Sequence, residues 1–286
     1  MPELPEVEVI RRGLARKLVG QTFIALKGTG QRLRRQSEAA ILAGLVGRQV
    51  TGLTRRGKYL LLQLDDGQRL LVHLGMTGRL LFLEPACELP AHAHLVLECG
   101  EGQRLVFQDV RRFGQVLLYP AGAVIPELQQ LGLEPWSRRL TPAWLAGRAA
   151  GRRRPLKNFL LDGRIIAGIG NIYASEILFA AGLPPQTPVG QLSLEAWTRL
   201  LQACRRILSQ AIRAGGTTIA DFADCEGQAG LFAVQLKVYG RAGEPCLVCG
   251  TPIQRLVQAG RSTFWCPCCQ SAEAGWQAQP RGAARG

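Results

Sequence analysis

Between residues 50 and 119 the apolar positions come in short runs that are separated by polar or glycine-containing turns. Runs of strand length include YLLLQL, RLLVHL and RLVFQ, and Asp66-Gly67 between the first two is a strong hairpin signal. A helix is predicted before them, because Pro5 suits a first helical position and apolar residues follow at helical spacing. That stripe consists of Val9, Ile10, Leu14 and Leu18. The pattern predicts an antiparallel β-domain preceded by one helix.

After residue 132 the apolar spacing changes to three and four residues. Ser193 is the predicted N-cap of a long helix that ends at Gly215-Gly216. Its apolar stripe consists of Leu194, Trp197, Leu201, Cys204, Leu208 and Ile212. Two shorter helices, near 155–161 and 171–181, flank a tight turn at Gly168-Ile169-Gly170. This arrangement is typical of a helix-turn-helix unit, which occurs both in DNA-binding proteins and in plain helical cores.

The charge of the chain points to an anionic partner. In 286 residues, 35 Lys and Arg against 21 Asp and Glu leave a net charge of +14 and a pI near 10.0. Nucleic acid is the leading partner and an anionic membrane is its rival. The most apolar stretch, 165–183, is interrupted by a glycine turn and by Glu176, so a membrane span is excluded. The acidic start of the chain does not resemble a secretory signal, and we expect a reducing compartment.

Four cysteines have the spacing of a zinc site. Cys246-x2-Cys249 and Cys266-x2-Cys269 are separated by sixteen residues, and two such knuckles offer Zn²⁺ four thiolates. Cys268 is an alternative fourth ligand, but the two-residue spacing favours Cys269. A site with four protein ligands has no open position, so the zinc is structural. Arg261, between the two knuckles, is then the candidate for a functional role.

The N-terminus offers a nucleophile. Removal of Met1 leaves Pro2 with a free secondary amine, and α-amino groups titrate near pH 8. Attack on an aldehydic sugar carbon would give an iminium, and Glu3 stands beside it as a proton donor. The alternative is that Pro5 and the acidic residues only begin a helix.

Basic residues form clusters at 32–35, 55–58, 111–112 and 152–157, and together they fit a groove that follows phosphates. Arg111 and Phe113 at a turn are candidates for a wedge in a base stack, as is Met76 in the loop HLGMTG. The alternative for Met76 and Phe113 is a place in the core.

Seven separated motifs, in order, closely resemble the bacterial formamidopyrimidine-DNA glycosylase family. They are MPELPEVE, RRGKYLLL, HLGMTGRL, DVRRFG, GIGNIYASE, GGTT and the two cysteine knuckles. The resemblance runs from Met1 to about Gln270.

The resemblance implies an α+β protein with an N-terminal antiparallel β-sandwich, a helix-two-turn-helix domain and a C-terminal zinc-finger β-hairpin that carries one structural Zn²⁺. We expect boundaries at 1–132, 133–225, 226–272 for a lesion loop with the finger, and 273–286 for a flexible tail. The implied activity is a bifunctional base-excision repair enzyme, which removes 8-oxoguanine and formamidopyrimidines from duplex DNA and cleaves the strand by β,δ-elimination. A monomer in the bacterial cytoplasm, with no membrane partner, is expected.

The resemblance also implies the site. Pro2 is the nucleophile, Glu3 the proton donor, Lys58 the residue for β-elimination and Arg261 the residue for δ-elimination, with Glu6 supporting them. The implied zinc ligands are Cys246, Cys249, Cys266 and Cys269. The implied DNA contacts are His73, Met76, His92, Arg111, Phe113, Arg152, Asn171 and Tyr239, and the segment Thr217 to Lys237 is the implied lid over the flipped base.

The chain departs from the family pattern at Val110, where proline is common, and at Ala220, where some relatives have a basic residue. Two other functions stay open from the sequence. One is the related endonuclease VIII type, which prefers oxidised pyrimidines, although Leu4 stands where that type has glycine. The other is a non-catalytic zinc protein that binds DNA.

Overall fold

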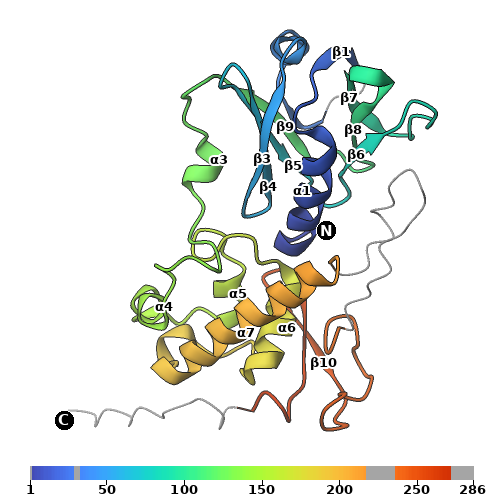
Figure 1. Cartoon of the computed structure of the whole chain (residues 1–286). Coiled ribbons are helices and arrows are strands. Elements are labelled where there is room, and N and C mark those ends of the chain that lie inside the picture. Colours follow the sequence, from blue (N-terminus) through green and yellow to red (C-terminus); the bar gives the residue numbers. More distant parts are fainter. Residues whose placement is uncertain (1, 29–32, 217–235, 272–286) are drawn as a thin grey trace, which may run out of the picture. The chain divides into compact units, whose positions relative to one another are not determined.

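The computed structural model describes residues 2–28, 33–216 and 236–271, and these fall into two units (Figure 1). The first unit contains residues 2–131 and 209–216, and the second contains 132–208 and 236–271. Several positions named above lie outside the described residues: Met1, Arg32, Ala220, all of the predicted lid except its last two residues, and the tail 273–286. The boundaries expected from the sequence at 132, 225 and 272 stay predictions.

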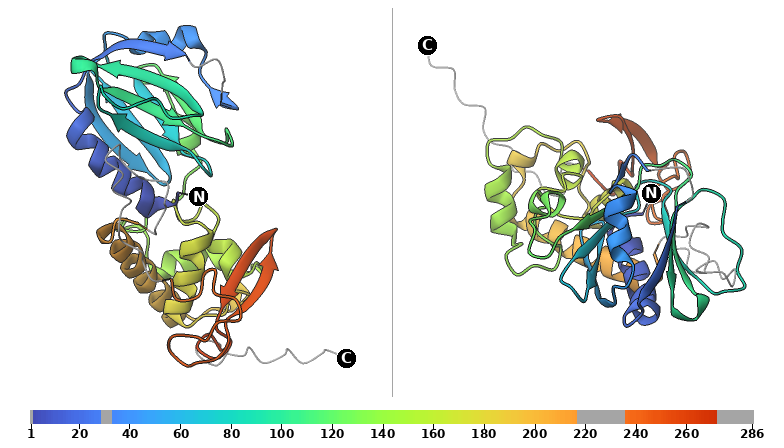
Figure 2. Two further views of the ribbon diagram at one scale, coloured as in Figure 1. Left: turned by 90° about the vertical axis from the view of Figure 1, so that its right-hand side faces the viewer. Right: turned by 90° about the horizontal axis from the view of Figure 1, so that it is seen from above.

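Two sheets form the β-sandwich of the first unit (Figure 1, Figure 2). The four-stranded sheet has the order β1 (Phe23–Gly28), β7 (Ala93–Cys99), β8 (Arg104–Gln108) and β6 (Arg79–Leu83). The five-stranded sheet has the order β2 (Arg35–Gln36), β9 (Gln115–Tyr119), β5 (Arg69–His73), β4 (Tyr59–Leu64) and β3 (Val50–Arg56). All neighbours are antiparallel except β2 and β9.

Strand β4 explains why its sequence reads as a nearly continuous apolar run. Leu60 and Leu62 enter the main core, which also holds Phe107 of the other sheet. Leu61 points to the opposite face, where it packs in a second cluster with Ile125. Because both faces of the strand are covered, the usual alternation of apolar and polar residues is absent. The predicted hairpin turn is confirmed, with Gly67 at φ +82° between β4 and β5.

Helix α1 (Leu4–Leu18) packs against the main core of the sandwich. The predicted stripe is correct at Ile10, Leu14 and Leu18, which are buried. Val9 was wrongly placed in it, because Val7 is fully buried and Val9 is partly exposed. Short elements complete the unit: α2 (Ala39–Leu42), α3 (Pro126–Gln129) and 3₁₀ turns at Ala43–Leu45 and Gly100–Gly102.

The chain crosses from one sheet to the other twice at the same end of the strands of the sandwich. The 74–78 crossing joins β5 to β6, and the 109–114 crossing joins β8 to β9. His73 pairs with Gln115 in one sheet and Arg79 pairs with Gln108 in the other. Both crossings therefore start and end at paired residues, which forces them to run side by side.

The second unit is helical and ends in a β-hairpin (Figure 2). Its elements are α4 (Pro142–Ala149), α5 (Leu156–Leu160), α6 (Asn171–Ala181), the 3₁₀ turn Val189–Gln191, most of α7 (Leu194–Arg213), β10 (Gln254–Gln258) and β11 (Arg261–Trp265). The rings of Phe159 and Trp197, 5.4 Å apart, join α5 to α7 in the core. Ser193 caps α7 through its Oγ, as predicted, but Leu194 is 56% exposed and does not belong to the apolar stripe.

Within the described ranges, no helix has both the length and the apolar character that crossing a membrane requires.

Candidate active site and zinc centre

Pro2 and Glu3 are buried at the point where α1 begins. Glu3 is the N-cap and forms a reciprocal capping box with Glu6, whose Oε2 accepts a hydrogen bond from the Glu3 backbone N–H at 2.9 Å. The first turn of the helix thereby fixes the backbone of the Pro2-Glu3 pair. The positive end of the helix dipole favours the two carboxylates and disfavours additional positive charge beside them. The alternative, a mere helix start, describes the local structure correctly but does not explain the burial of Pro2.

Gly216, from the GGTT motif, packs against this helix start. Its φ is +90°, and a Cβ at this position would lie 3.2 Å from Oε1 of Glu6. A side chain would therefore be strained by the backbone and crowded by the carboxylate. This close approach explains the second glycine of the motif, and the sequence did not reveal it.

His73 is held in its neutral form. Burial, together with the smaller effect of the Lys58 charge, lowers its pKa to about 4. The backbone N–H of Gly75 donates to Nδ1 at 3.1 Å, so the ring proton is on Nε2. The ring also packs 4.7 Å from that of Tyr59, its partner across the β4–β5 pair. A neutral imidazole with Nε2–H is a hydrogen-bond donor for an anion over the whole neutral range.

This shift predicts an acid-sensitive step in stability. The pKa of His73 is lower in the folded than in the unfolded state, where it is about 6.5, so the unfolded chain binds more protons between pH 6.5 and 4. The free energy of unfolding should fall by up to about 3 kcal/mol from this residue as the pH drops through that range. Denaturant titrations of the wild type and His73→Asn at several pH values measure this decrement. It should be absent from His73→Asn and present in His92→Asn, and an equal slope in all three would contradict the assignment.

The three predicted wedge residues lie on the two crossings between the sheets. Met76 is 42% exposed on the 74–78 crossing, so its alternative place in the core is wrong. Arg111 is exposed and Phe113 partly exposed on the 109–114 crossing. The Phe113 ring carries the guanidinium of Arg34 4.5 Å from its centroid and that of Arg111 at 5.3 Å. Residues far apart in the sequence thus meet as one group of an aromatic ring and two cations, and the exposed Met76 lies on the other crossing.

Two further predicted contacts are also at the surface. His92 is exposed with φ +62°, and Arg152 is exposed before α5. Other members of the basic clusters have internal partners. Arg55 is almost buried and pairs with Glu8 at 3.1 Å, and Arg154 pairs with Asp162 at 2.8 Å. The expectation that whole clusters follow phosphates is therefore too broad.

Glu8 is the carboxylate that holds Arg55, and it also pairs with Arg11 and Arg12. Burial raises its pKa, but hydrogen bonds and charge from Arg11, Arg12 and Arg55 outweigh burial and lower it to about 2. The carboxylate is thus ionised at every physiological pH and anchors β3 to α1.

In the second unit, Arg261 is exposed at the first position of β11. The next residue is fixed from two helices: the Ser262 carbonyl accepts hydrogen bonds from Nζ of Lys157 at 2.8 Å and from Nδ2 of Asn171 at 3.0 Å. Lys157 also donates to Oγ1 of Thr263 at 2.8 Å and is fully buried. Sequence reasoning placed Lys157 in a basic cluster that was expected to follow phosphates. Its actual partners lie about a hundred residues away, and no local signal identifies them.

Glu176 anchors the chain before the zinc hairpin. Its carboxylate accepts hydrogen bonds from the backbone N–H groups of Lys237, Val238 and Tyr239 at 2.9 to 3.0 Å. The ring of Tyr239 packs edge-on against that of Phe264, 5.0 Å away. The position of Tyr239, a predicted DNA contact, thus depends on an acidic residue whose only sequence signal is its place in an apolar helix.

The four predicted zinc ligands come together. The sulfurs of Cys246, Cys249, Cys266 and Cys269 all lie within 4.8 Å of one another. Sγ–Sγ separations of 3.4 and 3.9 Å are close to the edge of a tetrahedron with Zn–S bonds of about 2.3 Å, which is about 3.8 Å. Cys268 is exposed and stands outside this cluster. Hydrogen bonds from Thr251 lower the pKa of Cys249 to about 6, which favours the thiolate that zinc needs.

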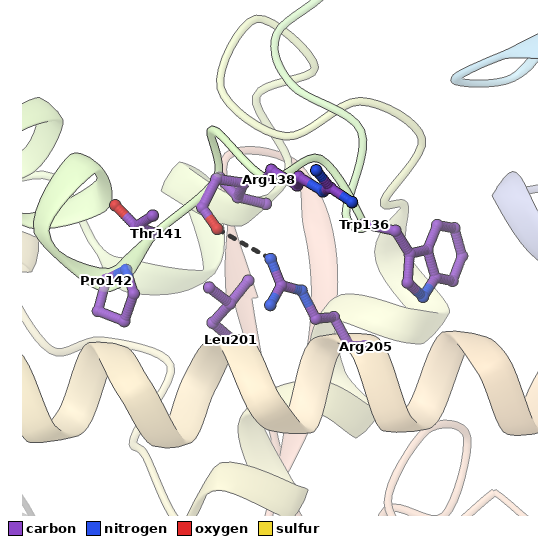
Figure 3. A pocket seen from close by; sticks show the side chains of 7 residues that line it. Trp136, Arg138, Thr141, Pro142, Leu201 and Arg205 are labelled. Atoms are coloured by element: carbon purple, nitrogen blue, oxygen red, sulfur yellow. Dashed lines mark hydrogen bonds between the residues drawn. The ribbon is translucent and has the colours of Figure 1, made fainter.

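A cavity of about 360 Å³ lies elsewhere in the second unit, between α7 and the loop before α4 (Figure 3). Its lining residues are Trp136, Arg138, Leu140, Thr141, Pro142, Leu201 and Arg205. Arg205 serves the loop itself, because it donates to the carbonyls of Pro135, Ser137 and Leu140. None of the predicted site residues lines this cavity.

The fold and the site define a class of modular zinc-finger proteins, with a β-sandwich, a helical unit and a four-cysteine hairpin. Comparison with known proteins identifies the family within this class. Residues 1–116 match the formamidopyrimidine-DNA glycosylase N-terminal domain, 131–223 match the H2TH domain of the same proteins, and 243–272 match the zinc finger found in FPG and IleRS.

Two relatives show the extent of the similarity. The chain is 48% identical over 283 residues to the formamidopyrimidine-DNA glycosylase of Cupriavidus pinatubonensis and 44% identical over 280 residues to that of Paracoccus denitrificans. Each comparison covers 94% of this chain and all of the relative.

Solved structures of Fpg (MutM) proteins also superpose on this chain. The MutM (Fpg) protein from Thermus thermophilus superposes with a TM-score of 0.83 at 40% identity, over 94% of this chain and 98% of that one. The Lactococcus lactis enzyme, non-covalently bound to DNA with an AP site, superposes with a TM-score of 0.85 at 33% identity, over 94% and 99%.

The chain belongs to the formamidopyrimidine-DNA glycosylase family. This family consists of DNA glycosylases with AP lyase activity. The predicted family, α+β fold class, enzyme class and single structural zinc are confirmed.

Proposed function

We propose that this protein removes oxidised purines, such as 8-oxoguanine and formamidopyrimidines, from duplex DNA and then cleaves the strand at the resulting site. Membership of the glycosylase family supports the activity on damaged bases. The roles of individual residues rest on the described geometry together with the family motifs.

The reaction begins at Pro2. Once Met1 is removed, the Pro2 nitrogen attacks C1′ of the damaged nucleotide, the glycosidic bond breaks, and its electron pair leaves with the base. Glu3 supplies a proton to the departing base or to the ring oxygen of the sugar. The Pro2 nitrogen loses its proton, and the C1′–O4′ bond then breaks, with its electron pair going to O4′, which is protonated. The open-chain product is an iminium between Pro2 and C1′, which acts as an electron sink for the next steps.

Strand cleavage follows from the iminium. Loss of a proton from C2′ expels the 3′ phosphate, and a second elimination expels the 5′ phosphate. Lys58 assists the first elimination and grips a phosphate, and Arg261 assists the second. Within the described part of the chain Arg261 forms no ion pair, so its guanidinium is available to a phosphate.

Reaching C1′ requires the nucleotide to leave the stack, which costs a few kcal/mol. Met76, Arg111 and Phe113 fill the space that it leaves. His73, His92, Arg152, Asn171 and Tyr239 bind the backbone around it. The partner is double-stranded DNA with oxidised bases, and we place the protein as a monomer in the bacterial cytoplasm, where that DNA is.

The observation that carries the proposal is the buried Pro2-Glu3 pair at the start of α1. Charge, helices and zinc are equally compatible with a protein that only binds DNA. Such a protein has no use for a buried secondary amine beside a carboxylate.

The test compares four 5′-labelled duplexes that contain 8-oxoguanine opposite cytosine, thymine glycol, an abasic site, or no lesion. We expect the 8-oxoguanine strand to be cut fastest, with phosphate at both ends of the gap, and borohydride to trap a covalent complex. Binding without cleavage of an abasic duplex would establish the non-catalytic alternative. Faster cleavage of thymine glycol would establish the endonuclease VIII type of preference.

A further inference from the structure

We propose that Asp109 is a positioning residue that joins the two crossings into one rigid wedge, and that its carboxylate thereby sets how efficiently the damaged nucleotide is extruded. The inference rests on the proposed function, because it concerns the residues that fill the space left in the stack. Asp109 directly precedes the 110–113 segment and has no role in the chemistry described above.

The carboxylate of Asp109 is completely buried and bonds to both crossings. Its Oδ1 accepts hydrogen bonds from Oγ1 of Thr77 at 2.6 Å and from the Arg111 backbone N–H at 3.2 Å. Its Oδ2 accepts one from the Gly114 backbone N–H at 2.7 Å. Thr77 follows Met76, Arg111 is itself a wedge residue, and Gly114 follows Phe113. One carboxylate is therefore hydrogen-bonded at or directly after each of the three wedge residues.

The two crossings also pack without a gap. A Cβ on Gly75 would lie 2.6 Å from the carbonyl carbon of Phe113. A Cβ on Gly114 would lie 2.4 Å from the Phe107 ring and 3.1 Å from Oδ2 of Asp109. Gly75 therefore has no room for a larger residue at its contact with the 109–114 crossing, and Gly114 has none against Phe107 and Asp109. The relative position of the two crossings is thus set by the hydrogen bonds to Asp109 together with this close approach.

The backbone of Asp109 connects a third segment. Its N–H donates to the His92 carbonyl at 3.0 Å, and its own carbonyl lies 2.8 Å from Nε2 of His94. The same carbonyl accepts from the backbone N–H of Arg112, which has φ +56°. The left-handed turn at Arg112 is therefore held at its start by Asp109. His92, a predicted DNA contact, is anchored at the same point.

The geometry requires a carboxylate. All three groups that face its oxygens are donors, and an ionised carboxylate only accepts. Within the described residues Asp109 forms no ion pair, so these donors alone offset the cost of burying the charge. In Asp109→Asn, one oxygen becomes an NH₂ group that meets a donor. The side chain keeps its size, but one of the links between the crossings is lost.

The consequence concerns duplex substrates. A wedge whose halves move independently fills the stack less well, so extrusion from a duplex should slow. A single strand with an abasic site has no partner strand to restack and no base to extrude, so its cleavage depends on the wedge much less. The ratio of these two rates separates a positioning role from general damage to the protein.

The experiment measures single-turnover excision of 8-oxoguanine from a duplex and cleavage of a single-stranded abasic oligonucleotide by wild type, Asp109→Asn and Phe113→Ala. Asp109→Asn should lower the duplex rate at least about tenfold more than the single-strand rate, and Phe113→Ala should show the same selectivity. A 2-aminopurine beside the lesion should report slower extrusion in Asp109→Asn. A proportional fall in both rates, or an unchanged duplex rate, would overturn the role of Asp109.

A second pair of variants keeps the test decisive if Asp109→Asn fails to fold. Thr77→Val removes the hydroxyl that donates to Asp109, and Thr77→Ser keeps it. Thr77→Val should lower the duplex rate selectively and Thr77→Ser should restore it; equal rates in the two variants would count against the proposal. If the wild type cleaves neither substrate, the proposed function itself is refuted. If the wild type is active and Asp109→Asn has the wild-type duplex rate, only the inference about Asp109 is refuted.

Discussion

Blocking the nitrogen of Pro2 is expected to abolish covalent trapping on 8-oxoguanine duplex. A chain that retains Met1 behind a short leader peptide has an amide at this position, and an amide nitrogen does not attack C1′. Both the excision and the strand cleavage rates should fall on the order of 1,000-fold or more, the scale seen when a covalent nucleophile is removed from other enzymes. A preparation from which Met1 has been removed should be fully competent.

The burial of Pro2 at the start of α1 makes this prediction specific, because the chain has a single α-amine and removal of Met1 places it at this buried position. Intact-mass measurement identifies the N-terminus of each preparation, and borohydride trapping followed by peptide mapping identifies the attached residue. Pro2→Gly, which keeps a primary amine in place, should trap more slowly than wild type. If the blocked chain traps at the wild-type rate while Lys58→Ala does not trap, Lys58 is the nucleophile.

Loss of the zinc is expected to have the second largest effect, on DNA binding. Structural zinc contributes about 10 to 16 kcal/mol to the folding of small zinc modules, and the hairpin β10–β11 ends directly at the cysteine cluster. Cys249→Ser should lose the metal, release β11 from its fixed position and weaken binding to a lesion duplex by at least about 100-fold, or about 2.8 kcal/mol. Arg261 would lose its place at the same time.

Cys268→Ser is the matched control, because Cys268 is exposed, adjacent to a ligand and outside the cluster. It should keep one zinc per chain and wild-type affinity. Zinc content is measured by atomic absorption and affinity by fluorescence anisotropy at fixed salt. Full affinity of a zinc-free Cys249→Ser chain would show that the finger takes no part in binding.

Local patterns identified most of the elements correctly. Strand lengths, the Asp66-Gly67 turn, the Ser193 cap and the cysteine spacing each depend on residues that are close in the sequence. The errors also have local causes. Val9 fits a helical stripe as well as Val7 does, and only packing shows that Val7 faces the core. Leu194 has the right spacing, but at the first position of α7 it stays exposed.

The site was identified from the sequence only as a set of separate motifs. The arginine clusters were all interpreted as surface, because a sequence does not show which cations have internal partners. Arg55 donates a hydrogen bond to Glu8, which is 47 residues away, and Lys157 donates one to Thr263, which is 106 residues away. Asp109 was quoted within a motif but not recognised, since its partner Thr77 is 32 residues distant.

The sequence alone indicated the family and its class of fold, through seven separated motifs in order. The candidate zinc ligands and the candidate nucleophile follow from residue types at short spacing. The tertiary structure alone decided which charges are buried, why Gly216 must be glycine, and that Met76 and Phe113 lie on adjacent crossings. The physical reason is the pairing of β5 with β9 and of β6 with β8. Strand register brings the 74–78 and 109–114 crossings together, and no pattern within either segment contains that information.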